Sequence, residues 1–199
     1  MTRSARIAMV MLLLTATACT GGGPSVKPPP ATTPAAPAKV KYEALLTCAQ
    51  VTQQVAGLPP FRTGNEKPSL SDLLTGCEFQ RIPDWPRINL QASAWRNDPD
   101  STYPPATGRG RGKARDAFDA PARPGSDPAD DGAADVGVGE QAKWLTPKDT
   151  DSCTLMILDD NAVLTLQNKP ADKPQPRSDE CRGPLREFAK SFYASLQPR

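Results

Sequence analysis

The stretch Cys153-Thr-Leu-Met-Ile-Leu-Asp-Asp-Asn-Ala-Val-Leu-Thr-Leu-Gln167 decides the fold of this chain. Its two apolar runs, 153–158 and 162–167, are separated by the tripeptide Asp159-Asp-Asn161. Asp and Asn favour tight turns, and short apolar runs bounded by turn residues favour strands. The stretch therefore predicts a β-hairpin with two antiparallel strands.

Two more strands are predicted upstream, over Cys77–Ile82 and Arg87–Arg96, joined across Pro83–Pro86. In the second, apolar and polar side chains alternate, which is the pattern of a strand with one buried face. We expect it to be half buried in an antiparallel sheet. The segment 59–76 is interpreted as a loop with one turn around Leu70–Leu74. The apolar face of the second strand carries Ile88, Leu90, Ala92 and Ala94, and its polar face carries Asn89, Gln91 and Ser93.

A short helix is predicted to begin after Thr47. Thr47 and Gln50 have the spacing of a capping box, and Gly57 marks the end of the helix. A single longer helix from Tyr42 is the alternative. In the short helix, Cys48, Val51 and Val55 share one face.

The last helix is predicted to begin at Pro184, because proline is favoured in the first turn of a helix. An apolar stripe at helical spacing follows, so this helix should pack against the sheet. An amphipathic helix on a membrane surface is the alternative, but the polar face is not rich in Lys or Arg. The stripe consists of Leu185, Phe188, Ala189, Phe192 and Leu196.

The segment 98–135 is rich in Pro, Gly, Asp and Arg and predicts a long irregular loop, with a helical tendency only at 114–120. Its cluster Arg109-Gly-Arg-Gly-Lys-Ala-Arg115 is typical of a site for phosphate or an acidic polymer. This makes Arg109 and Arg111 candidate ligand-binding residues. We favour the interpretation of a solvated loop over such a site, because three aspartates follow closely. Order is expected to return at Val136, in a segment too short to be a dinucleotide-binding loop.

The N-terminus has the pattern of a secretory signal over 1–18. Two arginines precede an apolar run at 7–14, which is shorter than the roughly 20 residues that span a bilayer. Cys19 follows directly, as in a bacterial lipobox, so we expect cleavage before Cys19 and acylation by palmitate-type chains. Cleavage by ordinary signal peptidase after Ala16-Thr-Ala18 is the alternative.

Behind the signal, the Pro-, Ala- and Thr-rich segment 19–39 predicts a tether, because it carries too little apolar surface to fold. A single extracytoplasmic domain is expected over 40–199. The net charge of +2 arises from Arg3 and Arg6 in the signal, so the remainder is formally neutral. This balance gives no reason to expect a nucleic-acid partner.

The cysteines support both export and acylation. With Cys19 as the lipid carrier, four remain, and outside the cytoplasm an even set of cysteines forms disulfides. Three connectivities are open. Sequential pairing, Cys48 with Cys77 and Cys153 with Cys181, is our first choice.

The chain contains no histidine. This excludes Ser-His and Cys-His catalytic pairs and every histidine-ligated metal site. Asp149 with Asp151, or Asp159 with Asp160, are acid-base or calcium candidates in principle, but they lack the pattern of an EF-hand loop. We expect no enzymatic activity, no cofactor and no resident metal.

Trp95 is a candidate ligand-binding residue if it is exposed, and packing beneath the long loop is the alternative.

The lipobox, the tether, Leu45-Leu-Thr47, Cys77, Gly137-Val-Gly-Glu-Gln-Ala142, the hairpin with Asn161 and the final helix together resemble the actinobacterial lipoproteins grouped as domain of unknown function 3558. The resemblance implies an exported α+β domain, with a small antiparallel sheet flanked by helices and two disulfides. It is also similar to extracellular sensor-type domains of some actinobacterial kinases. It supplies no reaction and no catalytic residues.

The resulting hypothesis is a lipid-anchored, non-enzymatic binding or accessory domain at the extracytoplasmic face of the cell membrane. Its partner would be a small ligand, an envelope polymer or an envelope protein held against one sheet face. An envelope hydrolase that uses Asp or Glu is the alternative, and a solute-binding component of a transporter is a third reading.

Overall fold

The computed structural model describes residues 39–67, 70–80, 87–97, 108–120, 129–146, 151–172 and 174–196. The predicted signal, Cys19 and the tether up to residue 38 lie outside the described residues. So do the connection Pro83–Pro86 and Asp149.

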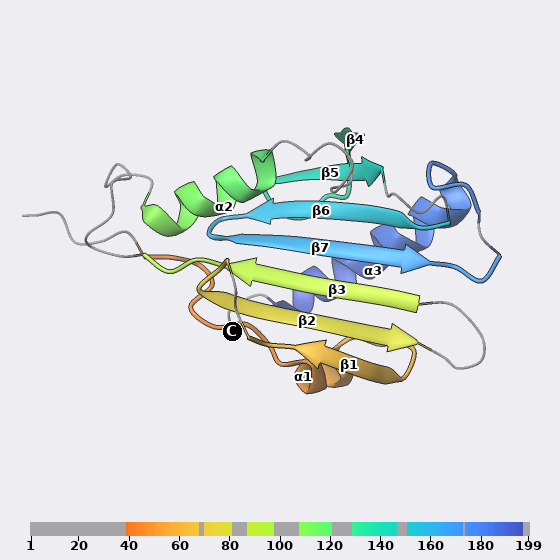
Figure 1. Cartoon of the computed structure of the whole chain (residues 1–199), viewed down its shortest axis with the longest axis horizontal. Helices are drawn as coiled ribbons and strands as arrows, with labels where there is room; N and C mark the ends of the chain where they lie inside the picture. Colours follow the sequence, from red (N-terminus) through yellow and green to blue (C-terminus); the bar gives the residue numbers. More distant parts are fainter. Residues whose placement is uncertain are drawn as a thin grey trace, which may run out of the picture. The chain divides into compact units, whose positions relative to one another are not determined.

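Within the described residues, seven strands form one antiparallel sheet with the order β1-β2-β3-β7-β6-β5-β4 (Figure 1). The predicted combination of an antiparallel sheet, helices and two disulfides is confirmed. The sheet is larger than the small one we expected. Its strands are β1 (Phe61–Asn65), β2 (Leu73–Gln80), β3 (Arg87–Ala94), β4 (Ala129–Ala133), β5 (Gln141–Thr146), β6 (Cys153–Asp159) and β7 (Ala162–Lys169).

The predicted hairpin is confirmed as β6 and β7, which lie inside the sheet between β5 and β3. The turn is tighter than the expected tripeptide, because Asp159 already pairs with Ala162. Asp160 adopts φ 52°, a left-handed conformation that Asp tolerates better than most residues. Asn161 is completely buried behind it.

Helices α1 (Cys48–Gln54) and α3 (Asp179–Leu196) pack on one side of the sheet, which we call the covered face. In Figure 1, α3 runs behind β3, β7 and β6, and α1 lies beside β1. The apolar core of the protein lies between these helices and the sheet. Its fully buried residues include Leu90, Leu155, Leu164, Leu166, Leu185 and Phe192.

Both predicted helices are present, and the capping box of α1 is formed between Thr47 and Gln50. The predicted start of α3 at Pro184 is wrong, because the helix begins at Asp179 and contains Pro184 in its second turn. The first turn is secured by the disulfide of Cys181 and by N–H groups that donate to the carbonyl of Ser178. Pro184 has no backbone N–H, so one hydrogen bond of the helix is missing, but the helix continues to Leu196. The predicted apolar stripe does face the core.

The helical tendency predicted at 114–120 lies within α2 (Arg109–Asp119), but the prediction of an irregular loop over 98–135 is wrong for the rest of that helix and for β4. Residues 98–107 and 121–128 lie outside the described residues. Helix α2 buries Gly110, Ala114 and Phe118 against the face of the sheet opposite to α3. Glycine lowers helix propensity, which concealed the helix in the sequence. At Gly110, however, a Cβ atom would lie 2.4 Å from the Trp95 carbonyl oxygen. The missing side chain is what lets α2 approach the sheet.

The prediction of a loop over 59–76 is wrong as well, because β1 and the start of β2 lie there. All five residues of β1 are exposed, so the strand has no apolar alternation to reveal it. Its position depends on pairing with β2 and on Gly64, where a Cβ atom would lie 2.8 Å from the sulfur of Cys48. Pairing that is distant in sequence overrides weak local preference here.

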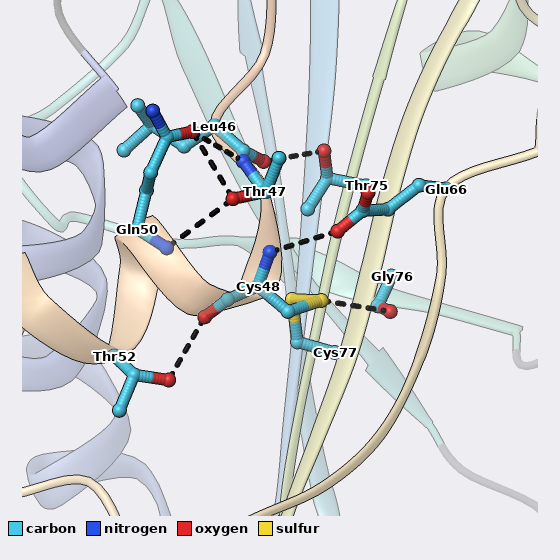
Figure 2. The surroundings of a disulfide bond; sticks show 9 residues. All are labelled: Leu46, Thr47, Cys48, Gln50, Thr52, Glu66, Thr75, Gly76 and Cys77. Atoms are coloured by element: carbon cyan, nitrogen blue, oxygen red, sulfur yellow. Dashed lines mark hydrogen bonds between the residues drawn. A yellow bond between two sulfur atoms is a disulfide. The ribbon is translucent and has the colours of Figure 1, made fainter.

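The predicted sequential disulfides, Cys48–Cys77 and Cys153–Cys181, are both present. Figure 2 shows the first, which fastens the beginning of α1 to β2. The backbone N–H of Cys48 donates to Glu66, and the Thr75 hydroxyl donates to the carbonyl of Leu46 (Figure 2). Each disulfide closes a loop of similar length, with sequence separations of 29 and 28.

Candidate functional site

The side of the sheet opposite to α1 and α3 is only partly covered, and we call it the open face. Helix α2 packs on it near the β6–β7 turn, against Leu158 and Val163. Beyond α2, over strands β1, β2, β3, β7 and β6, lies a hollow of about 650 Å³. This is within the size range of small-ligand sites in proteins, roughly 300–1,000 Å³.

The hollow is lined mainly by uncharged polar side chains. They come from alternate positions of the strands, opposite to the apolar residues that face the core. Four are amides and three are hydroxyls: Asn65, Asn89, Gln91 and Gln167, with Thr63, Thr154 and Thr165. Leu74 adds apolar surface, and Gly76 leaves a gap between Asn65 and Gln91, its two neighbours across the sheet.

One set of these side chains forms a continuous row across five strands, which we call the central row. Its members are directly paired in the sheet: Thr63 with Glu78, Glu78 with Asn89, Asn89 with Gln167, and Gln167 with Thr154. The Asn89 amide donates to Gln167 at 2.9 Å, and the Gln167 amide donates to Ser152 at 3.3 Å. These bonds fix the orientation of both amides.

Glu78 is the one charged group among the described residues that line the hollow. The guanidinium of Arg62 lies 3.6 Å from its carboxylate, at the β1 edge. The described residues of the lining therefore carry one partly neutralised acid and no cation. Such a surface is suited to hydrogen bonding with an uncharged ligand rather than to binding an anion.

The structure places Trp95 away from the hollow. Its side chain is 6% exposed and packs against Ala114 and Phe118 of α2, and its indole N–H donates to the carbonyl of Leu70. The ligand-binding role considered for Trp95 is thus contradicted. The alternative, packing beneath the segment that follows, is correct, although that segment contains a helix.

The cationic cluster of α2 does not line the hollow either. Arg111 binds Asp160 at the β6–β7 turn through two nitrogens, at 2.9 and 2.8 Å. These hydrogen bonds raise the pKa of Arg111 above its ordinary value. Arg115 lies 3.3 Å from Glu140, and Arg109 also has an interaction partner. Arg111 therefore holds α2 to the turn, and neither Arg109 nor Arg111 lines the hollow.

A second polar cluster surrounds the buried carboxylate of Asp159. The Lys41 ammonium lies 2.5 Å from this carboxylate and donates to Tyr193 at 3.1 Å, and the hydroxyl of Tyr42 donates to Asp159. Burial alone lowers the pKa of Lys41, but the bonds to Asp159 and Tyr193 outweigh it, so the pKa is raised. Asn161 bonds both backbone groups of Tyr42. This cluster fixes the segment where the chain enters the domain.

The three described aspartates considered as metal or acid-base sites, Asp151, Asp159 and Asp160, each have a different cationic partner, while Asp149 lies outside the described residues. Asp159 lies in the Lys41 cluster, Asp160 binds Arg111, and Asp151 pairs with Lys169 at 3.0 Å. Over the described residues, no group of three or more Cys, Asp or Glu side chains is placed to hold a metal ion.

No family model matches the chain, and neither the curated proteins nor the solved structures provide a match. Among the described helices, none has the length and apolar character needed to cross a bilayer. The two disulfides indicate an oxidising, extracytoplasmic environment.

The sequence did not predict the hollow, although it did predict the polar strand face to which part of the lining belongs. The alternation of β3 already placed Asn89 and Gln91 on a polar face. The same alternation in β7 separates Thr165 and Gln167 from Leu164 and Leu166. What the sequence does not reveal is that β3 and β7 are neighbours, because this pairing joins residues far apart in the chain.

Proposed function

We propose that the protein is a lipid-anchored extracytoplasmic lipoprotein whose domain binds a ligand without catalysis. The observation that supports this most directly is the hollow on the open face, with its row of oriented amides. Convergent polar groups in a concave site are the usual mark of ligand binding. The resemblance to the actinobacterial lipoproteins of domain of unknown function 3558 belongs to the same proposal.

The cysteine pairing supports the anchor. Cys48, Cys77, Cys153 and Cys181 are joined in two disulfides, which leaves Cys19 as the odd cysteine. An odd cysteine that directly follows an export signal is well suited to acylation. Two or more acyl chains hold a protein at a membrane far more firmly than one.

The alternative of an Asp/Glu hydrolase gains no support from the hollow. Glycoside hydrolysis by carboxylates requires two of them on either side of the scissile bond. In the described lining, Glu78 stands without a second carboxylate. A binding role therefore fits the residues better than a hydrolytic role.

The proposal is tested by native mass spectrometry of the full chain extracted in mild detergent from its own membranes. We expect a mature mass that begins at acylated Cys19, with a non-covalent adduct that is lost when the sample is denatured. A Gln91→Trp variant fills the hollow and should lose the adduct. Gln53→Trp, an exposed glutamine of α1 on the other side of the sheet, should keep it.

The outcomes separate the two parts of the proposal. An unacylated chain that begins elsewhere rejects the anchor. An adduct that survives Gln91→Trp, or the absence of any adduct from wild-type protein, rejects the hollow as a binding site.

A further inference from the structure

We propose that the hollow binds a neutral, polyhydroxylated chain, that is, an oligosaccharide segment laid across the strands of the open face. This inference rests on the proposed binding function and names its ligand class. It is based on the chemistry of the lining, the orientation of the amides and the spacing of the central row.

The lining matches the hydrogen-bonding groups of a sugar. Each sugar hydroxyl is both a donor and an acceptor, and a side-chain amide or hydroxyl offers both functions as well. An anionic polymer would instead require Arg or Lys in the lining, as in most sites for phosphate or carboxylate groups. The described lining provides four amides and three hydroxyls, and its one charged group, Glu78, is an acid partly neutralised by Arg62, so it offers nothing to attract an anion.

Two of the four amides, those of Asn89 and Gln167, are held in place before any ligand arrives. Asn89 is bonded to Gln167, and Gln167 to Ser152, which is completely buried. Fixed side chains lose less conformational entropy on binding, and this favours affinity. The Asn89 side chain donates through its Nδ2 atom, so its Oδ1 atom can accept a hydrogen bond from a ligand, and the Thr165 hydroxyl also lines the hollow.

The geometry of the central row suits a linear chain. Adjacent strands lie about 4.8 Å apart, so the five members span about 19 Å across the sheet. This step is comparable with the length of one sugar ring, so successive rings can meet successive strands. Leu74 also lines the hollow and offers an apolar surface to the C–H groups of a ring face.

A peptide fits this face less well. The backbone groups of β2, β3, β7 and β6 are already used in pairing with both neighbours, so a peptide could form no strand-like bonds there. Strand β1 is the described edge next to the hollow, and it is short, carries Arg62 and has a bulge between Phe61 and Thr63. These features protect an edge against the addition of another strand.

The test is calorimetric titration of the full chain in detergent with neutral hexasaccharides: β-1,4-linked glucose, α-1,4-linked glucose and β-1,4-linked N-acetylglucosamine. Hexagalacturonate serves as the charged probe of equal length. We expect at least one neutral hexasaccharide to bind and hexagalacturonate to bind at least about 10-fold more weakly. Gln91→Ala and Gln167→Ala should each weaken neutral binding by about 3- to 10-fold, the value of one hydrogen bond. The matched amide control, Gln53→Ala on α1, should leave it unchanged.

Failure of this inference is distinguishable from failure of the proposed function. If hexagalacturonate binds more tightly than the neutral hexasaccharides, the ligand class is wrong but the binding function stands. The same holds if no saccharide binds while the membrane-derived adduct still depends on Gln91. Saccharide binding that Gln91→Ala and Gln167→Ala do not change overturns the assignment of the glycan to the hollow.

Discussion

The two faces of the sheet use the same strands for different purposes. On the covered face, Leu90, Leu164 and their neighbours are packed against α3 and α1 without access to water. On the open face, Asn89, Gln91 and Thr165 come from the same strands, one position along, and line a polar hollow. Because side chains alternate along a strand, each strand contributes both to the core and to the candidate site.

The comparison teaches that stability and binding can be altered separately in this domain. Apolar burial on the covered face supplies the favourable free energy of folding. The amides of the open face leave part of their hydrogen-bonding capacity unused. Substitutions on one face should therefore change the free energy of unfolding, and those on the other should change affinity.

The largest loss of stability is expected from Phe192→Ala. Phe192 lies on α3 and is 1% exposed in the core of the covered face. Its truncation removes a large apolar side chain and leaves a cavity, so the free energy of unfolding should fall by about 3–5 kcal/mol. Urea denaturation of the full chain measures this, with exposed Ser191→Ala as the control. A loss below about 1 kcal/mol would show that α3 does not pack as described.

The two disulfides provide the next comparison, since all four cysteines lie in the core of the covered face. The loop-entropy relation predicts that removing either one lowers the free energy of unfolding by about 3.5 kcal/mol, because the loops have nearly equal length. The measurement is urea denaturation of Cys48→Ala/Cys77→Ala and of Cys153→Ala/Cys181→Ala. A difference well above 1 kcal/mol between them would mean that strain or packing outweighs loop length.

Asn161→Ala should cost about 2–3 kcal/mol, because it removes a buried amide that joins distant segments. The side chain bonds the N–H and C=O of Tyr42 and the C=O of Trp95, and all these groups lose their partner. Thermal denaturation measures the effect. The matched substitution Asn89→Ala, in the hollow, should lower the free energy of unfolding by less than about 1 kcal/mol. Equal losses would contradict the separation of the two faces.

The sequence alone was enough to predict the elements in which the apolar positions of the sequence are also the positions that are buried in the structure. In β3 the apolar residues alternate as in a strand, and in α3 they recur at helical spacing, while the hairpin 153–167 has two apolar runs around a turn. The capping box at Thr47 and the sequential disulfides are likewise local features. These elements produce most of the covered face.

The remaining elements depend on contacts that no local pattern reveals. Strand β1 is exposed at every position, and β4, Ala129-Asp-Asp-Gly-Ala133, owes its strand conformation to pairing with β5. Helix α2 contains two glycines, one of which is required by the approach to Trp95. The hollow follows from the pairing of β3 with β7, so its polar residues were visible in sequence while their convergence was not.

Lys41 makes a smaller, pH-dependent contribution to stability through its contact with Asp159 at the end of β6. Its folded pKa is raised above the ordinary 10.5, mainly through Asp159, so its contribution to stability is complete below about pH 10.5 and lost as the pH rises through the folded pKa. We expect the free energy of unfolding of the wild type to exceed that of Lys41→Gln by at most about 1 kcal/mol at pH 8, and this difference to shrink at pH 11. Chemical denaturation at both values measures it. A difference that grows at pH 11 would reverse the sign and refute the ion pair.

The smallest effect on stability is expected from Gln91→Ala on the open face. Gln91 is exposed, and its described hydrogen bond is a long one of 3.5 Å to Ser93. Its loss should change the free energy of unfolding by less than about 0.5 kcal/mol, whereas Leu90→Ala, one position away on the same strand, should cost about 2–5 kcal/mol. Urea denaturation of the two variants compares both faces within one strand. If Gln91→Ala cost as much as Leu90→Ala, the Gln91 amide would be part of the folded framework and would not be available for hydrogen bonding to a ligand.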